Sequence, residues 1–423
     1  MGKIELDHTG SGGGVTLSSD GTDLLLDGTA IGGGSPDLYA DNYDGSSTLP
    51  SATGTNAIAI GANSSTSGNN GVAIGRYASC TGTAIALGYS ANASAAAVSI
   101  TGNGTSSASA GGAIAIGRVT ASGIGSIGIS QAGNTITAAT ASGNYSVAIG
   151  ANSTPAASVS TGSASMALQG SYASGTDSFA AAIANNTSSY GATGNNSIAM
   201  GDEAKATTNY AVAIGAETQS RNWYGISIGY QNDNGTLDKA LTLGWQNTTS
   251  GNRSVAIGDN NDCTTADAYA LGTRAKSSVR GKYAYASGQF AAAGDAQGGQ
   301  FILRADTTDA TATVLTTNNS TAGSDDQIVA ASDTCIMFSG TIVAMQNGAQ
   351  DQGGWEIKGL LKNDGGTTTL VSSNIQTFAD GNGWTVALSA DNTNNALAIT
   401  CTGEAAHNIR WVANISTSEV TYA

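Results

Sequence analysis

Pairs of apolar residues, two positions apart and usually followed by glycine, recur sixteen times between Ala57 and Tyr285. Clear copies are Ala57–Gly61, Val72–Gly75 and Val255–Gly258. An apolar period of two residues predicts short β-strands. The second apolar positions of the sixteen copies are Ile60, Ile74, Leu87, Ile100, Ile116, Ile129, Ile149, Leu168, Ile183, Met200, Ile214, Ile228, Leu243, Ile257, Leu271 and Tyr285.

The intervals between these positions are mostly 13 to 15 residues, with longer intervals of 20 and 19 after Ile129 and Ile149. This period is too short for a helical-hairpin repeat or a propeller blade, and it suits one turn of a β-solenoid with two strands and two tight corners. The longer intervals then predict loops at one corner. Glycine follows the pair in 11 of the 16 copies, where we expect a positive φ or close packing against the next turn.

Ten of these apolar side chains are predicted to form the core of the solenoid. They are Ile60, Ile74, Leu87, Ile116, Ile149, Ile214, Ile228, Leu243, Ile257 and Leu271. Sixteen turns at about 4.8 Å each would make a rod of about 75 Å. One turn offers a core only a few small side chains wide, so a lone solenoid would bury little apolar surface. Packing three copies around an axis would bury one face of each, which predicts a homotrimer.

The segments on either side of the repeats have different patterns. Residues 1–50 contain two short strand-like runs, Val15–Leu17 and Leu24–Leu26, and then a Gly-rich and acidic stretch that reads as a hinge and linker. Residues 290–423 contain eight candidate strands and two predicted hairpin turns, Lys362–Gly366 and Asp391–Asn395. The candidate strands are Gln300–Arg304, Ala312–Leu315, Cys335–Phe338, Thr341–Met345, Trp355–Leu361, Thr385–Leu388, Ala396–Thr400 and Ile409–Val412.

The predicted fold class is therefore all-β: a parallel β-solenoid shaft followed by an antiparallel β-sandwich or jelly roll. Residues 1–50 are assigned to an attachment segment and linker, residues 51–289 to the shaft, and residues 290–423 to the C-terminal domain. The chain has 59 glycines among 423 residues and a net charge of −15. This charge argues against nucleic acid or an anionic membrane as a partner, since both favour clustered Lys and Arg.

No catalytic, cofactor or metal site is predicted. Gly225–Gly229 matches the GxSxG nucleophile motif by letter, but it also occupies the repeat register, which favours a scaffold role. The two histidines, His8 and His407, lie at opposite ends of the chain. Asn- and Asp-rich turns such as Asp259–Asp262 lack EF-hand spacing, and turn formation explains them without Ca²⁺. The four cysteines suit buried free thiols, although Cys335 and Cys401 both lie in strand-like runs that could pair.

Four aromatic residues fall beside successive turns, where small polar residues usually stand. They are Trp223, Tyr224, Tyr230 and Trp245. Exposed in a row, such side chains can stack on sugar rings or on a protein surface. Packing across the seam of a trimer or under a loop is the alternative. These four are the candidate recognition residues of the sequence.

The repeats resemble the YadA-like head of trimeric autotransporter adhesins, notably Asn144–Ser153 and Arg253–Asn260. That resemblance implies a left-handed parallel β-roll that trimerises. The segments Lys3–Thr22 and Gly281–Gln297 are similar to virion proteins of tailed phages, especially fibres of marine phages and cyanophages. A phage fibre needs no export signal, and no apolar signal-peptide core follows Met1.

The predicted function is a non-enzymatic, homotrimeric tail fibre or other virion appendage, made in the host cytoplasm. Residues 1–50 would bind other virion proteins, and the C-terminal domain would attach to a glycan or protein of the host surface. The alternatives are a bacterial cell-surface adhesin, a head or neck decoration fibre without receptor role, and a polysaccharide-degrading tailspike. A tailspike usually needs paired carboxylates, and no Asp or Glu occurs between Gly45 and Thr176.

Overall fold

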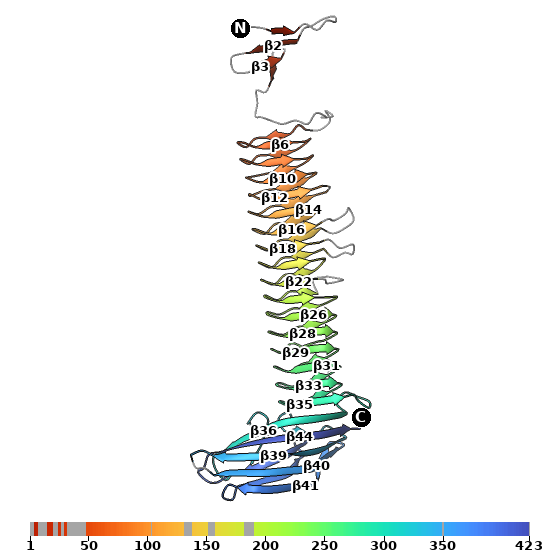
Figure 1. Ribbon diagram of the computed structural model, residues 1–423, viewed down its shortest axis with the longest axis vertical. Coiled ribbons are helices and arrows are strands. Elements are labelled where there is room, and N and C mark those ends of the chain that lie inside the picture. Colours follow the sequence, from red (N-terminus) through yellow and green to blue (C-terminus); the bar gives the residue numbers. More distant parts are fainter. Residues whose placement is uncertain are drawn as a thin grey trace. The chain divides into compact units, whose positions relative to one another are not determined.

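The computed structural model describes residues 4–6, 15–19, 24–26, 29–31, 48–102, 104–130, 138–150, 157–181, 190–348 and 351–422. In these ranges every regular element is a β-strand, and no helix is long and apolar enough to cross a membrane. The chain divides into two units, residues 1–177 and residues 178–423. Figure 1 traces the strands of each unit in sequence order.

The N-terminal strands form an antiparallel meander in the order β1-β2-β3-β4. Leu17 pairs with Ile4 on one side and with Leu26 on the other. Both strands predicted in this segment are present, while the predicted hinge and linker lie outside the described residues. The four strands are β1 (Ile4–Leu6), β2 (Val15–Ser19), β3 (Leu24–Leu26) and β4 (Thr29–Ile31).

The first unit also contains a parallel β-solenoid, in which each turn adds one strand to each of two sheets (Figure 1). Ile60 pairs with Ile74, and Ile74 with Leu87, so the counted intervals are the true turns. The first sheet contains β6 (Ile58–Ile60), β8 (Val72–Ile74), β10 (Ile85–Gly88), β12 (Val98–Thr101), β14 (Ile114–Gly117), β16 (Ile127–Ser130), β18 (Val147–Ile149) and β20 (Met166–Leu168). The second contains β5 (Ser51–Ala52), β7 (Ser65–Thr66), β9 (Ser79–Cys80), β11 (Ala91–Ala93), β13 (Ser106–Ala108), β15 (Val119–Ala121), β17 (Ala139–Ala141), β19 (Val159–Ser160) and β21 (Tyr172–Ala173).

The second unit begins with further solenoid turns of the same kind. Ile214 pairs with Ile228, and Ile257 with Leu271, in parallel register. The first sheet contains β22 (Phe179–Ala181), β24 (Ile198–Met200), β26 (Val212–Ala216), β28 (Ile226–Tyr230), β29 (Leu241–Trp245), β31 (Val255–Asp259), β33 (Tyr269–Thr273) and β35 (Tyr283–Ser287). The short strands of the other wall are β23 (Gly191–Ala192), β25 (Lys205–Ala206), β27 (Gln219–Ser220), β30 (Thr248–Thr249), β32 (Asp262–Cys263) and β34 (Lys276–Ser277). The predicted all-β solenoid with a period of about 14 residues is confirmed.

One turn differs from the sequence prediction. The sequence pattern places a turn at Ile183, but this residue lies in residues 182–189, outside the described part. The strand of this turn is Phe179–Ala181 instead, and Ala181 pairs with Met200. The long interval therefore falls after Ala181. The long intervals after Ile129 and Ile149 each correspond to one turn as predicted, because Ile129 pairs with Ile149 and Ile149 with Leu168.

A small residue between the two apolar residues of each pair faces the interior. Ala213, Ala256 and Ala270 are fully buried there. The opposite wall contributes a second column of small side chains, such as Cys263 and Ser277. These columns fill the narrow space between the two sheets, where a leucine or isoleucine would not fit.

The remaining strands build an antiparallel domain with two sheets. The larger sheet has the order β36-β44-β39-β40-β41, and in the smaller one β43 pairs with β37, β38 and β42. Tyr283 of the last solenoid strand pairs with Gln300, which joins the solenoid sheet to the larger sheet. The strands are β36 (Ala296–Thr307), β37 (Thr313–Val314), β38 (Ile328–Val329), β39 (Thr334–Gln346), β40 (Gln352–Asp364), β41 (Thr367–Asp380), β42 (Thr385–Asp391), β43 (Ala396–Thr402) and β44 (Ile409–Thr421).

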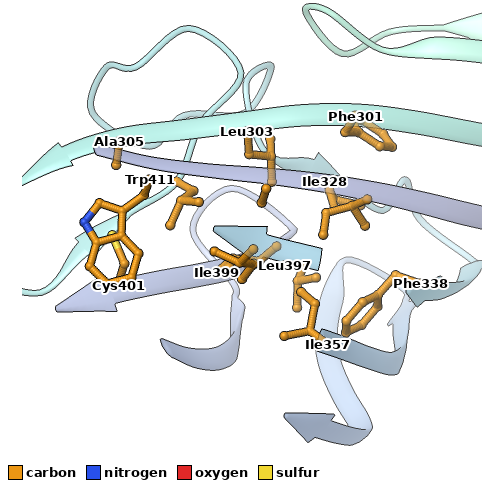
Figure 2. Packing of buried hydrophobic residues seen from close by; sticks show 14 of the residues in the cluster. Phe301, Leu303, Ala305, Ile328, Phe338, Ile357, Leu397, Ile399, Cys401 and Trp411 are labelled. Atoms are coloured by element: carbon orange, nitrogen blue, oxygen red, sulfur yellow. The ribbon is translucent and has the colours of Figure 1, made fainter. Parts of the chain in front are cut away.

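The only wide apolar core in the described residues lies between these two sheets (Figure 2). Trp411 stacks at 5.3 Å between ring centroids on Trp355 and contacts Trp384 at 5.7 Å. Phe301 and Phe338 are buried in the same cluster. All eight predicted strands occur, but Cys335–Phe338 and Thr341–Met345 are one continuous strand, β39, and β38 and β41 were not predicted. Both predicted hairpin turns connect paired strands, β40 to β41 and β42 to β43.

Candidate functional site: the outer face of the solenoid

The apolar pairs of the repeat lie on the outer face of the first solenoid sheet. Since Ala256 points inward, its neighbours Val255 and Ile257 point outward. Ile74 is 37% exposed and Leu243 39% exposed. The same alternation holds in turn after turn, so each unit has two parallel columns of apolar side chains on its surface.

The prediction that these residues form the solenoid core is therefore wrong for the single chain. Among the ten, Ile74, Ile116, Ile149 and Leu243 are exposed, and Ile60, Leu87, Ile214, Ile228, Ile257 and Leu271 are half-buried. The space between the two sheets is filled by alanine and other small residues. The sequence carried this signal, because the residue between the paired apolar positions is small in every described turn. These small residues include Ala59, Ala73, Ala86, Ser99, Ala115, Ala148, Ala199, Ala213, Ser227, Thr242, Ala256, Ala270 and Ala284.

The glycine that follows the pair allows the turns to approach closely. Gly258 has a φ of 123°. A Cβ atom built there would lie 2.0 Å from the carbonyl oxygen of Gly272 in the next turn. Both expected roles of this glycine, the positive φ and the close packing, are confirmed at this position.

Three of the four candidate aromatic residues lie in two clusters rather than one row, and the first cluster also includes Tyr210. Tyr224 stacks on Tyr210 with 4.8 Å between ring centroids and nearly parallel planes. Tyr230 contacts Trp245 at 4.5 Å with tilted rings. Tyr224 precedes strand β28 and Tyr230 ends it, so the two clusters flank the apolar columns on opposite sides. Trp223, Tyr224 and Trp245 are each about half exposed.

A ladder of polar side chains runs beside Tyr230 and Trp245. Gln231 donates through Nε2 to Glu217 at 2.6 Å, and Gln246 donates to Gln231 at 2.6 Å. Asn260 continues the ladder by donating to Gln246 at 3.0 Å. Partial burial and the nearby Glu217 raise the pKa of the Tyr230 hydroxyl. Sequence inspection missed this ladder because its members differ in type and share only their position in the turn.

A second ladder, of buried asparagines, stabilises the corner inside the same turns. Asn247 donates through Nδ2 to Asn232 at 3.0 Å, and Asn261 donates to Asn247 at 2.9 Å. Each of these two side chains also donates to a backbone carbonyl of the next turn, Asn247 to Gly258 and Asn261 to Gly272. These corner asparagines are therefore bonded to one another and to the backbone across successive turns. No group of three or more His, Cys, Asp or Glu side chains suited to a metal ion occurs in the described residues.

The GxSxG match is part of the scaffold. Ser227 is fully buried in the solenoid interior, and its Oγ lies 2.7 Å from Oγ1 of Thr242. A nucleophile needs an adjacent base and access to substrate, and this hydroxyl has neither in the described structure. His407 lies near Glu404, with Nδ1 3.1 Å from its carboxylate, and His8 lies outside the described residues. Cys335 and Cys401 are free thiols rather than a disulfide.

These features define a class of protein: a parallel β-solenoid with a small-residue interior, an apolar outer face and a C-terminal domain of antiparallel sheets. Four segments of the chain match the YadA head domain repeat (2 copies), at residues 52–78, 137–153, 192–218 and 243–261. The resemblance seen in the repeats is thereby confirmed as a family match of those segments. A search of curated proteins finds no match to the sequence.

Proposed function

We propose that the chain is the subunit of a homotrimeric adhesive fibre. The observation that carries this proposal is the pair of apolar columns on the outer face of the solenoid. Scattered surface apolar residues need no explanation, but a contiguous apolar face marks an interaction site. YadA-like adhesin heads are trimeric and bind host surfaces, which makes a second and third copy of this chain the natural partners of that face.

The geometry of the apolar face suits packing against the same face of another copy of the chain. The columns repeat in register with the turns, so the same pattern is presented along each unit. Identical faces brought together around an axis bury the same columns in every copy. The two sheets of the solenoid leave little room for a core of their own, so this association supplies the apolar burial that the interior lacks.

In this proposal the solenoid is the spacer and the C-terminal domain makes the contact with a glycan or protein of a host surface. Three copies of that domain on one fibre would act together, because binding of one raises the effective concentration of the others. The solenoid repeats belong to an adhesin-type family that is typically non-enzymatic. A scaffold role for Gly225–Gly229 agrees with this.

We place the fibre in a virion, where residues 1–50 would bind other virion proteins. The support is the resemblance of Lys3–Thr22 and of Gly281–Gln297 to phage fibres. A bacterial cell-surface adhesin is the second candidate, and the match to the YadA head repeat favours it equally. Immunogold labelling with an antibody against this chain separates the two: label on particles supports the virion, and label on the bacterial envelope supports the cell-surface adhesin.

The experiment that tests the fibre is a solution mass measurement by light scattering on the purified full chain. We expect three times the chain mass of 41.6 kDa, together with attachment of the labelled protein to cells of a susceptible or colonised host. A stable, folded monomer would refute the assembly. A trimer that attaches to no cell surface would leave the assembly standing and refute the adhesive role.

A further inference from the structure

A pocket opens at one end of the larger C-terminal sheet, where three neighbouring strands end together. Strands β36, β44 and β39 are adjacent there, because Asp306 pairs with Arg410 and Arg410 pairs with Met345. The pocket has a volume of about 550 Å³, within the range of small-molecule sites. Thr307, Gln346, Asn347 and Asn408 line it as well. The pocket lies at the far end of β36 from the segment that pairs with the last solenoid strand.

Gln346, in the wall of this pocket, has a buried acceptor without a partner. The residue is only 5% exposed, and its Oε1 accepts no hydrogen bond from the described residues. The neighbouring buried hydroxyl, Oγ1 of Thr307, already accepts from Nε1 of Trp411 at 3.0 Å. Oε1 of Gln346 has almost no exposed surface, so a ligand reaches it only when the side chain turns toward the pocket. A ligand hydroxyl that then donates to this atom would supply the hydrogen bond that buried polar atoms usually have.

The charges of the pocket wall cancel. Nε of Arg410 donates to Oδ1 of Asp306 at 3.2 Å, and Asn319 donates to Oδ2 of the same carboxylate at 2.9 Å. An anionic or cationic ligand would compete with this pair and leave one charge without its partner. A neutral ligand with many hydroxyl groups would keep the pair and gain charge-assisted hydrogen bonds from it.

The rest of the wall has the same amphipathic character. Asn347 and Asn408 offer carboxamide groups, and the backbone N–H of Asn347 donates to the carbonyl of Asn408 at 2.9 Å, which holds the two segments together. Met345 and Ile409 supply apolar surface between these polar groups. Alternating apolar and hydrogen-bonding surface matches a sugar ring, which has C–H groups on its faces and hydroxyls at its edge.

We propose that this pocket binds a neutral saccharide, with a ligand hydroxyl donating to Oε1 of Gln346 and further hydroxyls bonded to Asp306 and Arg410. The inference rests on the proposed adhesive function and names the recognition site of the C-terminal domain. It also moves recognition away from Trp223, Tyr224, Tyr230 and Trp245, which flank the face assigned to trimer contacts.

The test compares the full-length wild type with two matched variants, Gln346→Met and Gln376→Met, on an array of neutral and sialylated glycans. Methionine is nearly isosteric with glutamine but has no amide. Gln376 lies exposed on β41, outside the pocket. We expect the wild type and Gln376→Met to bind a common set of neutral glycans, and Gln346→Met to bind them at least tenfold more weakly, as loss of one buried hydrogen bond implies.

Stability separates a binding role from a structural one. Replacing an orphan acceptor with an apolar side chain should leave the melting temperature unchanged or raise it, although binding is lost. Arg410→Ala is the second variant, because its side chain is 88% exposed and its loss should not affect folding. We expect it to weaken glycan binding as well.

Three outcomes would overturn the inference: equal binding by Gln346→Met and Gln376→Met, binding of sialylated glycans alone, or no binding of any glycan by the wild type. Cell attachment distinguishes this inference from the proposed function. If Gln346→Met attaches to cells as well as the wild type, the pocket is not the receptor site and the adhesive role stands. If the wild type attaches to no cells, the adhesive role itself fails.

Discussion

Replacing both Ile228 and Ile257 with aspartate tests whether the outer apolar columns hold copies of the chain together. Both side chains point outward from the first solenoid sheet and are half-buried in the single chain. The control is Ser250→Asp, which places one aspartate on an exposed position at the opposite wall. In the single chain all three substitutions remain hydrated.

The magnitude follows from the exposure of the columns. Fully burying an Ile, Leu or Val side chain contributes about 1.5–3 kcal/mol, and residues such as Leu243 are 39% exposed in the single chain. Covering the remaining third therefore contributes about 0.5–1 kcal/mol per residue. The second unit alone presents fourteen residues in these columns, seven exposed and seven half-buried, so the upper limit is roughly 14 kcal/mol per copy. They are Ile198, Met200, Val212, Ile214, Ile226, Ile228, Leu241, Leu243, Val255, Ile257, Tyr269, Leu271, Tyr283 and Tyr285.

Two aspartates per chain remove their share of this burial and place carboxylates in an apolar contact, at a cost of several kcal/mol each. We expect the double variant to dissociate into folded monomers, with the solution mass falling to 41.6 kDa and the β-sheet circular dichroism retained. The control should stay trimeric. A double variant that remains trimeric with an unchanged melting temperature would refute the assignment of this face, and an unfolded monomer would show that the isoleucines stabilise the single chain instead.

Three further predictions concern the interior. Gly258→Ala should destabilise the fold by about 2 kcal/mol or more, measured by thermal melting, because alanine disfavours the positive φ and its Cβ would clash with the next turn; an unchanged melting temperature would contradict the close packing. Asn247→Ala should cost about 2–3 kcal/mol by breaking the buried ladder and leaving its partners unpaired, whereas a loss below about 0.5 kcal/mol would show that water replaces it. Burial raises the pKa of Cys263 and Cys401 to about 12, so at pH 8 a thiol reagent should label only the half-buried Cys335 quickly in the folded protein. The contribution of these protonated thiols to the free energy of unfolding should be complete below the ordinary pKa of a thiol and be lost as the pH rises toward 12. Fast labelling of Cys263 at pH 8 would contradict its burial.

Much of the C-terminal domain could be predicted from alternation, but strand β41 could not. Its sequence, Thr367–Asp380, is largely exposed on both faces, so it lacks the inward apolar positions by which a half-buried strand is recognised. Pairing with β40 along its whole length makes it a strand. Cys335–Phe338 and Thr341–Met345 were separated in the prediction because Ser339 and Gly340 interrupt the apolar run, yet both lie within β39 and pair with β40 and β44.

The candidate site, too, could be predicted only in part from the sequence. The aromatic residues were visible in the sequence, but their grouping into two clusters depends on which turn positions lie above one another. The pocket at the end of the larger sheet was not foreseen at all. Its walls come from residues about 40 and 60 positions apart along the chain, and only the register of β36, β44 and β39 brings them together.

The sequence by itself determined the solenoid, because the apolar pairs recur with the length of one turn and glycine follows where turns must approach. The tertiary structure alone decided which side of each strand faces the interior. Alternation marks two faces of a strand but does not name the inner one. The two walls lie too close for isoleucine, so Ala256 and its equivalents fill the interior, and Val255 and Ile257 remain on the surface. The motif that looked like a core is therefore the face on which we propose that the chain assembles.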